Sequence, residues 1–213
     1  MTATRPLRAL LVNGSPHENG NTATALAEIA KTLEEEGIAT ELFWIGTKPL
    51  RGCIACGACR AKGLGRCVFA DDACNALGDK FAAADAFVVG SPVYYGQPAG
   101  QLLALLQRAF FSHPGCVAGK PGASVAVCRR GGSTAAFECL NMPFQMQNCL
   151  LVCSQYWNIA FGREPGEAAK DAEGMQTMRT LARNLAWLAK NLNRDGAVPR
   201  PEGEPWTPTH FIR

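Results

Sequence analysis

Four cysteines between residues 53 and 67 have a spacing that suits metal chemistry. Cys53, Cys56, Cys59 and Cys67 form a C-x2-C-x2-C-x7-C pattern in a segment that also contains glycines. Three closely spaced thiolates and a fourth from further along the chain can bind an iron-sulfur cluster, whereas zinc sites usually combine two separated C-x2-C pairs. The pattern therefore favours a [4Fe-4S] cluster over zinc. Redox-active or structural free thiols in a reducing compartment are the alternative.

The segment NGSPHENGNT, residues 13–22, contains the residue types that bind a phosphate group. It has neither the G-x-G-x-x-G spacing of dinucleotide-binding loops nor the G-K-[ST] ending of a P-loop. Hydroxyl and amide side chains and the unpaired N–H groups of the helix that follows can converge on an anion, and glycines let the backbone approach it. The alternative is an ordinary helix start in which Asn19 or Asn21 is only the N-cap. The candidate ligands are Ser15, His17, Gly20, Asn21 and Thr22.

Two later loops have residues that suit a flat, charged ligand. The first contains Pro92, Val93, Tyr94, Tyr95 and Gly96, and the second contains Arg129, Arg130, Gly131 and Gly132. The first loop offers a mostly apolar wall with backbone polar groups on its edge, which suits a planar heterocycle. The arginines and glycine amides of the second could stabilise negative charge at one edge of such a ring. Core packing of the tyrosines and a plain surface turn are the alternatives.

These loops follow apolar runs of strand length that alternate with segments of helical periodicity. The expected strands are residues 7–13, 40–45, 86–90, 124–128 and 149–155, and the expected helices are 22–36, 71–84, 102–111, 133–146 and 171–192. This alternation predicts an α/β fold with a five-stranded, doubly wound parallel sheet and helices on both faces. Ligands of such sheets bind outside the carboxyl ends of the strands, where the winding reverses. The loops after the first, third and fourth strands therefore form the candidate site.

Length and composition exclude several classes of protein. The chain has 213 residues, of which 47% are hydrophobic and 18% charged, so it can bury a large core and is not intrinsically disordered. The net charge is +3 and the sequence has no basic run longer than two residues, so no nucleic-acid partner is expected. The first apolar stretch is too short for a signal peptide or a membrane span, which predicts a cytoplasmic protein without a membrane partner.

One domain is expected for residues 1–193, with residues 48–67 as a cysteine-rich insert. Residues 194–213 form a tail whose four prolines exclude a helix or a central strand. Trp206, Phe211 and Ile212 are apolar residues suited to packing on a neighbouring subunit, and a solvated end is the alternative.

In their order along the chain, several segments resemble the flavodoxin-like NADPH-dependent FMN reductases, in particular the branch of iron-sulfur flavoproteins. The segments are NGSPHENGNT, RGCIACGACR with a later RCVFADD, ADAFVVGSPVYYG, RRGGSTAAFECLN, and SQYWNIAFG followed by DAEGMQTMRTLARNLAWL. The resemblance runs from about residue 10 to residue 192. It implies a flavodoxin-like sheet of strand order 2-1-3-4-5, with residues 1–193 as an FMN-binding domain. It also implies non-covalent FMN, with its phosphate in loop 15–22 and its ring against loop 92–96, and a homodimer or homotetramer. The x7 gap before Cys67 is at the long end for cluster-binding members.

The resemblance implies an FMN-dependent NAD(P)H oxidoreductase that reduces a small-molecule acceptor, such as a quinone, a free flavin, a metal ion or a nitro-aromatic, or another protein. Hydride transfer from a stacked nicotinamide needs close geometry and no protein acid or base, so no catalytic side chain is predicted. Tyr156 and Trp157 are expected either to line the acceptor side or to pack against the last helix. The alternative functions are an iron-sulfur flavoprotein that carries electrons between protein partners, and a thiol or metal-binding regulator. Flavodoxin-type carriers usually present an acidic docking face, which the positive net charge does not suggest.

Overall fold

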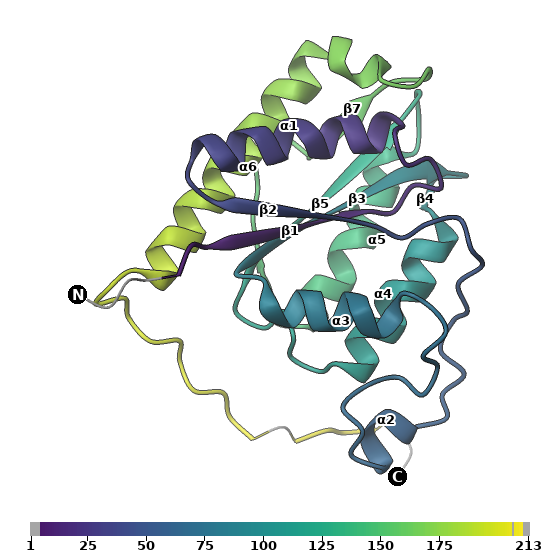
Figure 1. Ribbon diagram of the computed structural model, residues 1–213, viewed down its shortest axis with the longest axis vertical. Coiled ribbons are helices and arrows are strands. Elements are labelled where there is room, and N and C mark those ends of the chain that lie inside the picture. The colour runs from purple at the N-terminus through teal and green to yellow at the C-terminus, as the bar shows by residue number, and fades with distance from the viewer. Residues whose placement is uncertain (1–4, 206, 211–213) are drawn as a thin grey trace.

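A twisted parallel sheet runs through the middle of the molecule in the computed structural model, which describes residues 5–205 and 207–210 (Figure 1). Its main path is, in spatial order, β2 (Ala39–Trp44), β1 (Arg8–Asn13), β3 (Ala86–Tyr94), β5 (Pro121–Cys128) and β6 (Leu150–Leu151). The strand β7 (Ile159–Phe161) pairs with β5 in parallel, beyond the two residues paired by β6, and β4 (Gln97–Pro98) pairs with β3 in antiparallel. The predicted doubly wound sheet and its strand order are confirmed, with β6 and β7 sharing the fifth position.

Helices cover the sheet on both faces, as predicted. The helices α1 (Asn21–Glu35) and α6 (Ala172–Asn193) lie on one face, and α3 (Cys74–Ala83), α4 (Gly100–Ser112) and α5 (Ser133–Met146) lie on the other (Figure 1). Two short elements complete the chain, namely α2 (Ala58–Ala61) in the cysteine-rich segment and the 3-10 helix η1 (Glu167–Lys170) before α6. Right-handed crossovers between parallel strands produce this two-sided cover.

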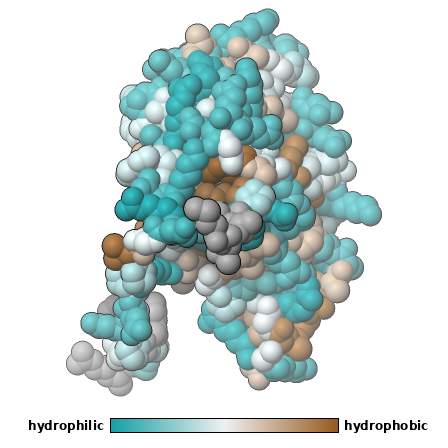
Figure 2. All heavy atoms as spheres, turned by 60° about the vertical axis from the view of Figure 1, so that its left-hand side comes forward, coloured by the Kyte–Doolittle hydropathy of each residue, from teal (hydrophilic) through white to brown (hydrophobic). Residues whose placement is uncertain are grey.

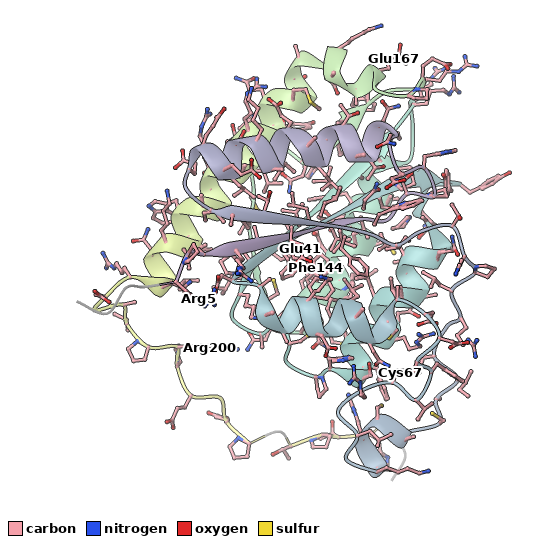
Figure 3. All side chains as sticks on the ribbon, viewed as in Figure 1. Arg5, Glu41, Cys67, Phe144, Glu167 and Arg200 are labelled. Carbon is pink, nitrogen blue, oxygen red and sulfur yellow. The ribbon has the colours of Figure 1, made fainter. Side chains whose placement is uncertain are left out.

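Two hydrophobic cores lie on the two faces of the sheet. On the α1 and α6 face, the apolar stripe Leu26, Ile29 and Leu33 of α1 is fully buried against β1, β3 and β5. On the other face, four phenylalanines pack with ring centroids 5.1–5.9 Å apart, mostly edge to face: Phe81, Phe87, Phe110 and Phe144. Phe144 is labelled in Figure 3, beneath the sheet. These rings fix α3, α4 and α5 against the strands that carry the loops of the candidate site.

The prediction of one continuous fifth strand over residues 149–155 is wrong. Only Leu150 and Leu151 pair with β5, after which the chain leaves the sheet and returns as β7. Polar side chains build the excursion, because the Ser154 hydroxyl donates to the Tyr156 carbonyl at 2.7 Å and the Asn158 amide donates to the Ser124 carbonyl at 3.1 Å. These side-chain bonds compete with the sheet ladder for the backbone. The third strand also differs from the prediction, since it runs on to Tyr94, where it pairs with β4.

The starts of α1 and α3 differ in their capping. Neither Asn19 nor Asn21 caps α1, because the N-cap is Gly20, which offers no side chain for a bond. An acidic side chain lies at the start of α3, where Asp72 accepts from the Cys74 N–H at 3.0 Å although Ala73 is the N-cap. The start of α1 therefore presents backbone N–H groups that no capping side chain covers within the described residues.

The face where the strands begin is shown in Figure 2. Hydrophilic side chains cover most of it, and hydrophobic ones gather in a hollow near its centre. A cavity of about 520 Å³ lies at this end of the molecule, between the start of β5 and the tail at Val198 and Arg200. The described tail, residues 194–205 and 207–210, contains no helix or strand, as its prolines predict. Trp206, Phe211 and Ile212, the predicted apolar anchors, lie outside the described residues. No helix in the described part of the chain is both long and apolar enough to cross a membrane.

Candidate functional site

A cleft of about 360 Å³ lies at the carboxyl ends of β1, β3 and β5. It is the position at which the winding of the sheet reverses, and its volume falls in the range of small-molecule sites, roughly 300–1,000 Å³. Nine of the predicted ligand residues line it: Ser15, His17, Gly20, Asn21, Thr22, Pro92, Val93, Tyr94 and Arg129. The structure therefore brings together residues from the three loops that the sequence identified.

The first loop is held in shape by its own side chains and by β3. Asn13 is fully buried; its Oδ1 accepts from the Ser15 N–H at 3.0 Å, and its Nδ2 donates to the Glu18 carbonyl at 3.1 Å. The Gly14 N–H donates to the Gly90 carbonyl at 2.9 Å. A Cβ at Gly14 would lie 2.4 Å from Leu102 Cδ2, so only glycine fits there. These contacts fix the shape of the loop, and a loop held in this way loses less conformational entropy on binding a ligand.

Asn21 has a different role from the one its position suggests. Its Nδ2 donates to the Glu164 carbonyl at 2.9 Å, and its Oδ1 accepts from the Ala168 N–H at 2.9 Å. Both ends of the side-chain amide therefore tie the start of α1 to loop 162–168, which follows β7. Asn21 shapes the cleft by joining two of its walls, and its backbone N–H is the group left to face a ligand.

The aromatic wall of the cleft is the end of β3 and its hairpin with β4. Tyr95 and Gly96 form the two central positions of the turn, with φ of 51° and 76°, the left-handed values of a type I′ turn. Tyr94 lines the cleft with its side chain partly exposed, and burial raises the pKa of its hydroxyl above the ordinary value. Val93 and Pro92 complete a mostly apolar surface beside it.

The other predicted residues lie outside the cleft lining among the described residues. Tyr95 is fully exposed at the tip of the hairpin. A Cβ at Gly132 would lie 2.8 Å from the Gly96 Cα, so these two glycines let the hairpin approach the start of α5 closely. Arg130 and Gly131 are exposed beside them. Of these residues, only Gly132 is shown in close contact with the hairpin.

Five residues that sequence reasoning missed also line the cleft: Val127, Cys128, Gly162, Arg163 and Pro165. The last three belong to the loop after β7. The sequence contained a signal for them, since the run GREPG has the composition of a turn. It was missed because the predicted fifth strand ended at residue 155, so the loop was not placed at this edge of the sheet.

The four predicted metal-binding cysteines line a second, smaller cavity of about 20 Å³ between the cysteine-rich segment and the end of α4. Cys53 and Cys56 are exposed, and Cys59 and Cys67 are half-buried. The Ala55 N–H donates to Cys53 Sγ at 3.4 Å, and left-handed backbone at Ala55 and Gly57 turns the chain around the cavity. Cys67 and Glu167, both labelled in Figure 3, lie at opposite sides of the molecule, so this cavity is separate from the loop 162–168 wall of the cleft.

The described thiols do not form a site for a single metal ion. In the described chain, no group of three or more His, Cys, Asp or Glu side chains converges on one point that would hold a single metal ion. Tetrahedral zinc would require sulfur atoms about 3.8 Å apart, given a Zn–S distance of about 2.3 Å. A cubane cluster has its iron atoms at separate corners, so its thiolate ligands are spread around it. The four thiols that line this cavity are the residue type that such a cluster takes as ligands.

Comparison with known proteins identifies the family. The model of the NADPH-dependent FMN reductase family matches residues 7–164. An iron-sulfur flavoprotein of Methanocaldococcus jannaschii is 30% identical over 196 residues, which cover 88% of this chain and 100% of that protein. The chain belongs to the NADPH-dependent FMN reductase family, in its iron-sulfur flavoprotein branch. It is therefore a flavin-binding oxidoreductase.

Other relatives agree with this assignment. An iron-sulfur flavoprotein of Methanosarcina thermophila is 29% identical over 192 residues, covering 86% of this chain and 97% of that protein. Among solved structures, RosB with bound 8-demethyl-8-formylriboflavin-5′-phosphate has a TM-score of 0.66 at 14% identity, covering 97% of this chain and 96% of RosB. A flavodoxin from the Archaea has a TM-score of 0.58 at 14% identity, covering 86% and 99% of the two chains. At this low identity the solved structures establish the flavodoxin-like fold alone.

Proposed function

We propose that this member of the FMN reductase family holds FMN in the cleft and transfers reducing equivalents from NADH or NADPH to an electron acceptor. The observation that carries the proposal is the cleft itself, which combines a helix N-terminus with hydroxyl side chains at one end and an apolar aromatic wall at the other. In FMN, the phosphate group matches the first end of the cleft and the isoalloxazine ring matches the second. Bound FMN would supply two-electron exchange with a nicotinamide and one-electron exchange with a cluster.

The phosphate end of the proposed site uses the start of α1. Gly20, Asn21 and Thr22 present backbone N–H groups at the positive end of the dipole of a 15-residue helix. The first turn of α1 contains no acidic side chain, so no carboxylate opposes an anion there. Ser15 is 3% exposed, and its hydroxyl accepts from the His17 N–H at 3.0 Å, which leaves its own proton free to be donated to a phosphate oxygen.

The ring end of the proposed site uses the hairpin and two arginines. Val93 and Tyr94 offer apolar surface to a flat ring, and Arg129 and Arg163 line the same cleft from opposite loops. Both guanidinium groups favour negative charge, either on the reduced ring or on the phosphates of an incoming nicotinamide nucleotide. These residues would bind and orient the ligands, because hydride transfer from a stacked nicotinamide needs close geometry and no protein acid or base.

The acceptor side is proposed to include Tyr156 and Trp157. Their side chains are 62% and 46% exposed, and their rings lie 5.1 Å apart in a T-shaped arrangement. They line a pocket of about 210 Å³ whose other walls include Ser133 and Phe161, the neighbours of Gly132 and Gly162 in the chain. An aromatic acceptor or the nicotinamide itself fits such a surface.

A second candidate function is an iron-sulfur flavoprotein that carries electrons between protein partners. The observation that favours it is the cavity that Cys53, Cys56, Cys59 and Cys67 line together. These four cysteines are the proposed ligands of a [4Fe-4S] cluster. Two of these thiols are exposed, so a cluster held by them would be close to the surface and within reach of a partner protein. The two functions share the same cofactors and differ in the source and destination of the electrons.

Anaerobic mixing of the FMN-loaded protein with NADH or NADPH separates these functions. Loss of the flavin absorbance within seconds supports the reductase. A bound flavin that dithionite reduces but neither nucleotide reduces supports the carrier, and failure to bind FMN contradicts both. Iron and acid-labile sulfide, assayed on protein purified without oxygen and on the Cys56→Ser variant, test the cluster. Iron in the unaltered protein and its loss in the variant are expected, and absence of iron from both would exclude ligation.

A further inference from the structure

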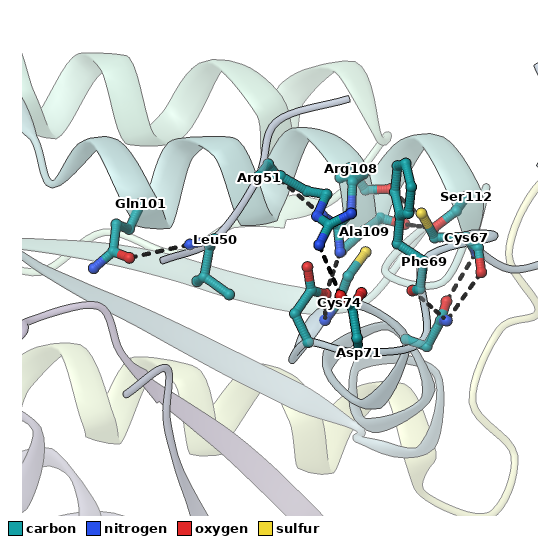
Figure 4. Close-up of polar contacts among 12 residues, drawn as sticks. Leu50, Arg51, Cys67, Phe69, Asp71, Cys74, Gln101, Arg108, Ala109 and Ser112 are labelled. Atoms are coloured by element: carbon teal, nitrogen blue, oxygen red, sulfur yellow. Dashed lines mark hydrogen bonds and ion pairs between the residues drawn. The ribbon is translucent and has the colours of Figure 1, made fainter. Parts of the chain in front are cut away.

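A buried arginine lies at the end of α4 that faces the cysteine-rich segment. The side chain of Arg108 is 2% exposed and lines the cavity of the four thiols. Its Nη1 donates to the Arg51 carbonyl at 2.8 Å, and its Nη2 pairs with the carboxylate of Asp72, which is 10% exposed (Figure 4). A buried ion pair is seldom a better way to stabilise a fold than apolar packing, because both charges lose their hydration. The position of this pair therefore points to another use.

The contacts of Arg108 reach both ends of the cysteine-rich segment. Arg51 precedes the first ligand, Cys53, and Asp72 follows the last, Cys67. Between them, the Phe69 ring lies 4.5 Å from the guanidinium of Arg51 and 5.8 Å from that of Arg108. Asp72 also accepts from the Cys74 N–H at 3.0 Å and so fixes the start of α3. One side chain of α4 thus holds the chain on both sides of the ligand set.

The two members of this ion pair differ in their position relative to the cavity. Arg108 belongs to the cavity lining, whereas Asp72 does not belong to it among the described residues. The positive member is therefore the nearer one. Arg108 Nε and Asp72 Oδ2 are both buried and have no hydrogen-bond partner within the described part of the chain. Arg108 therefore brings a buried positive charge to the wall of the cavity, where it would attract negative charge placed inside.

We propose that Arg108 is a positioning residue for the cluster, and that its buried cation offsets the negative charge of the four thiolates and so favours the reduced cluster. This inference rests on the cluster named in the proposed function. Reduction adds one electron, given by reduced flavin, and forms or breaks no bond. The added negative charge is attracted to Arg108 through a medium of low polarity, where a unit charge within about 10 Å shifts such an equilibrium about tenfold.

The Arg108→Met variant tests the charge, because methionine is apolar and fits buried sites. Redox titration of the cluster absorbance in the loaded protein should show the reduction equilibrium shifted about tenfold toward the oxidised form. For one electron, this shift is a reduction potential lower by 59 mV. Arg108→Lys keeps the charge but cannot reach both the Arg51 carbonyl and Asp72. Its equilibrium should stay within threefold of the unaltered protein.

Arg66→Met is the matched control. Arg66 is also an arginine paired with an aspartate, at 3.0 Å from Asp79, and adjoins the ligand Cys67, but both side chains are more than half exposed. Water and salt screen its charge, so the reduction equilibrium should change less than twofold. An equal shift in the Arg66 and Arg108 variants would show that burial is irrelevant and would overturn the proposal.

The Asp72→Asn variant should shift the reduction equilibrium in the direction opposite to that of Arg108→Met. It keeps the shape and the acceptor Oδ1 but removes the negative charge that partly offsets Arg108, so the equilibrium should shift toward the reduced form. Absence of iron from the unaltered protein would contradict the proposed cluster itself. Iron with an unchanged equilibrium in both Arg108→Met and Asp72→Asn would overturn this inference alone. Loss of iron from both variants, with apoprotein melting temperatures unchanged, would likewise overturn the charge role and leave Arg108 as a structural tie.

Discussion

Removal of the Asn21 side chain should open one wall of the cleft. Asn21→Ala deletes the bonds to the Glu164 carbonyl and from the Ala168 N–H, each 2.9 Å long. A hydrogen bond contributes about 1 kcal/mol net, and a buried N–H left without a partner costs about 1–3 kcal/mol. Ala168 is fully buried, so its N–H cannot turn to water without local rearrangement. We therefore expect a loss of about 2–3 kcal/mol in the free energy that holds loop 162–168 against α1.

This loss should appear in two measurements. Thermal unfolding of the apoprotein should show a melting temperature lower by about 4–12 °C, given 2–4 °C per kcal/mol for a chain of this size. FMN affinity, followed by quenching of flavin fluorescence, should fall by about 30- to 140-fold if binding requires the closed loop, because 1.4 kcal/mol corresponds to a factor of ten. Asn21→Asp keeps the acceptor but places a carboxylate beside the phosphate position. It should lose less stability and more FMN affinity than Asn21→Ala.

Asn19→Ala is the control for these measurements, because Asn19 lies in the same loop but is exposed and has no side-chain hydrogen bond among the described residues. Both its melting temperature and its FMN affinity should match the unaltered protein. The reasoning is refuted if Asn21→Ala melts and binds FMN as the unaltered protein does.

Four further changes have definite expected results. Gly162→Ala places a Cβ 2.7 Å from the Ala168 N and 2.8 Å from Asn21 Cγ, so FMN affinity should fall at least about tenfold in a fluorescence titration. The control Gly100→Ala has open space at its Cβ position and should leave FMN affinity unchanged. Asp171→Ala removes two acceptors, one that caps α6 by accepting from the Gly174 N–H and one that accepts from the Phe161 N–H. In urea, the free energy of unfolding should be lower by about 2 kcal/mol. Burial raises the pKa of Cys149 to about 12, so iodoacetamide at pH 8 should modify exposed Cys153 well before Cys149, as peptide mass mapping would show. Burial opposes ionisation of Asp72, but the bonds from Arg108 and from the Cys74 N–H outweigh it and lower the pKa of Asp72. Its contribution to stability is therefore present above the ordinary carboxyl range near pH 4 and is lost as the pH falls through the lower folded-state value, so acid should destabilise the unaltered protein more than Asp72→Asn.

The sheet and its helices could be predicted because their signals are local. Residues 8–13 and 121–128 are nearly continuous buried runs, and the apolar stripe of α1 repeats with the helical period. The fifth strand could not be predicted correctly, because the break after Leu151 depends on the bond between the Asn158 amide and the Ser124 carbonyl, 34 positions earlier in the chain. A tertiary contact of this kind leaves no periodic pattern in the sequence.

The candidate site was predictable to the same extent as the strands that carry it. The loops after β1, β3 and β5 were identified because their strands were, and Gly162 and Arg163 were missed because β7 was. The role of the Asn21 side chain depends on a partner in loop 162–168, far along the chain. Arg108 lies on an amphipathic helix, where an arginine is normally exposed, and only the fold shows that it is buried.

The helix α4 connects the two proposed cofactor sites physically. It begins just after the aromatic hairpin, where the Ala99 N–H donates to the Ser91 hydroxyl at 2.9 Å, and its Leu102 packs where a side chain at Gly14 would lie, so it buttresses the phosphate loop. Its other end carries Arg108 and Phe111 into the cysteine cavity. The 13 residues of α4 span about 20 Å, and a helix buried along one side is a rigid spacer over that length. The separation between a flavin and a cluster in one subunit would therefore be set by a single helix, whose sequence must satisfy glycine packing at one end and a buried ion pair at the other.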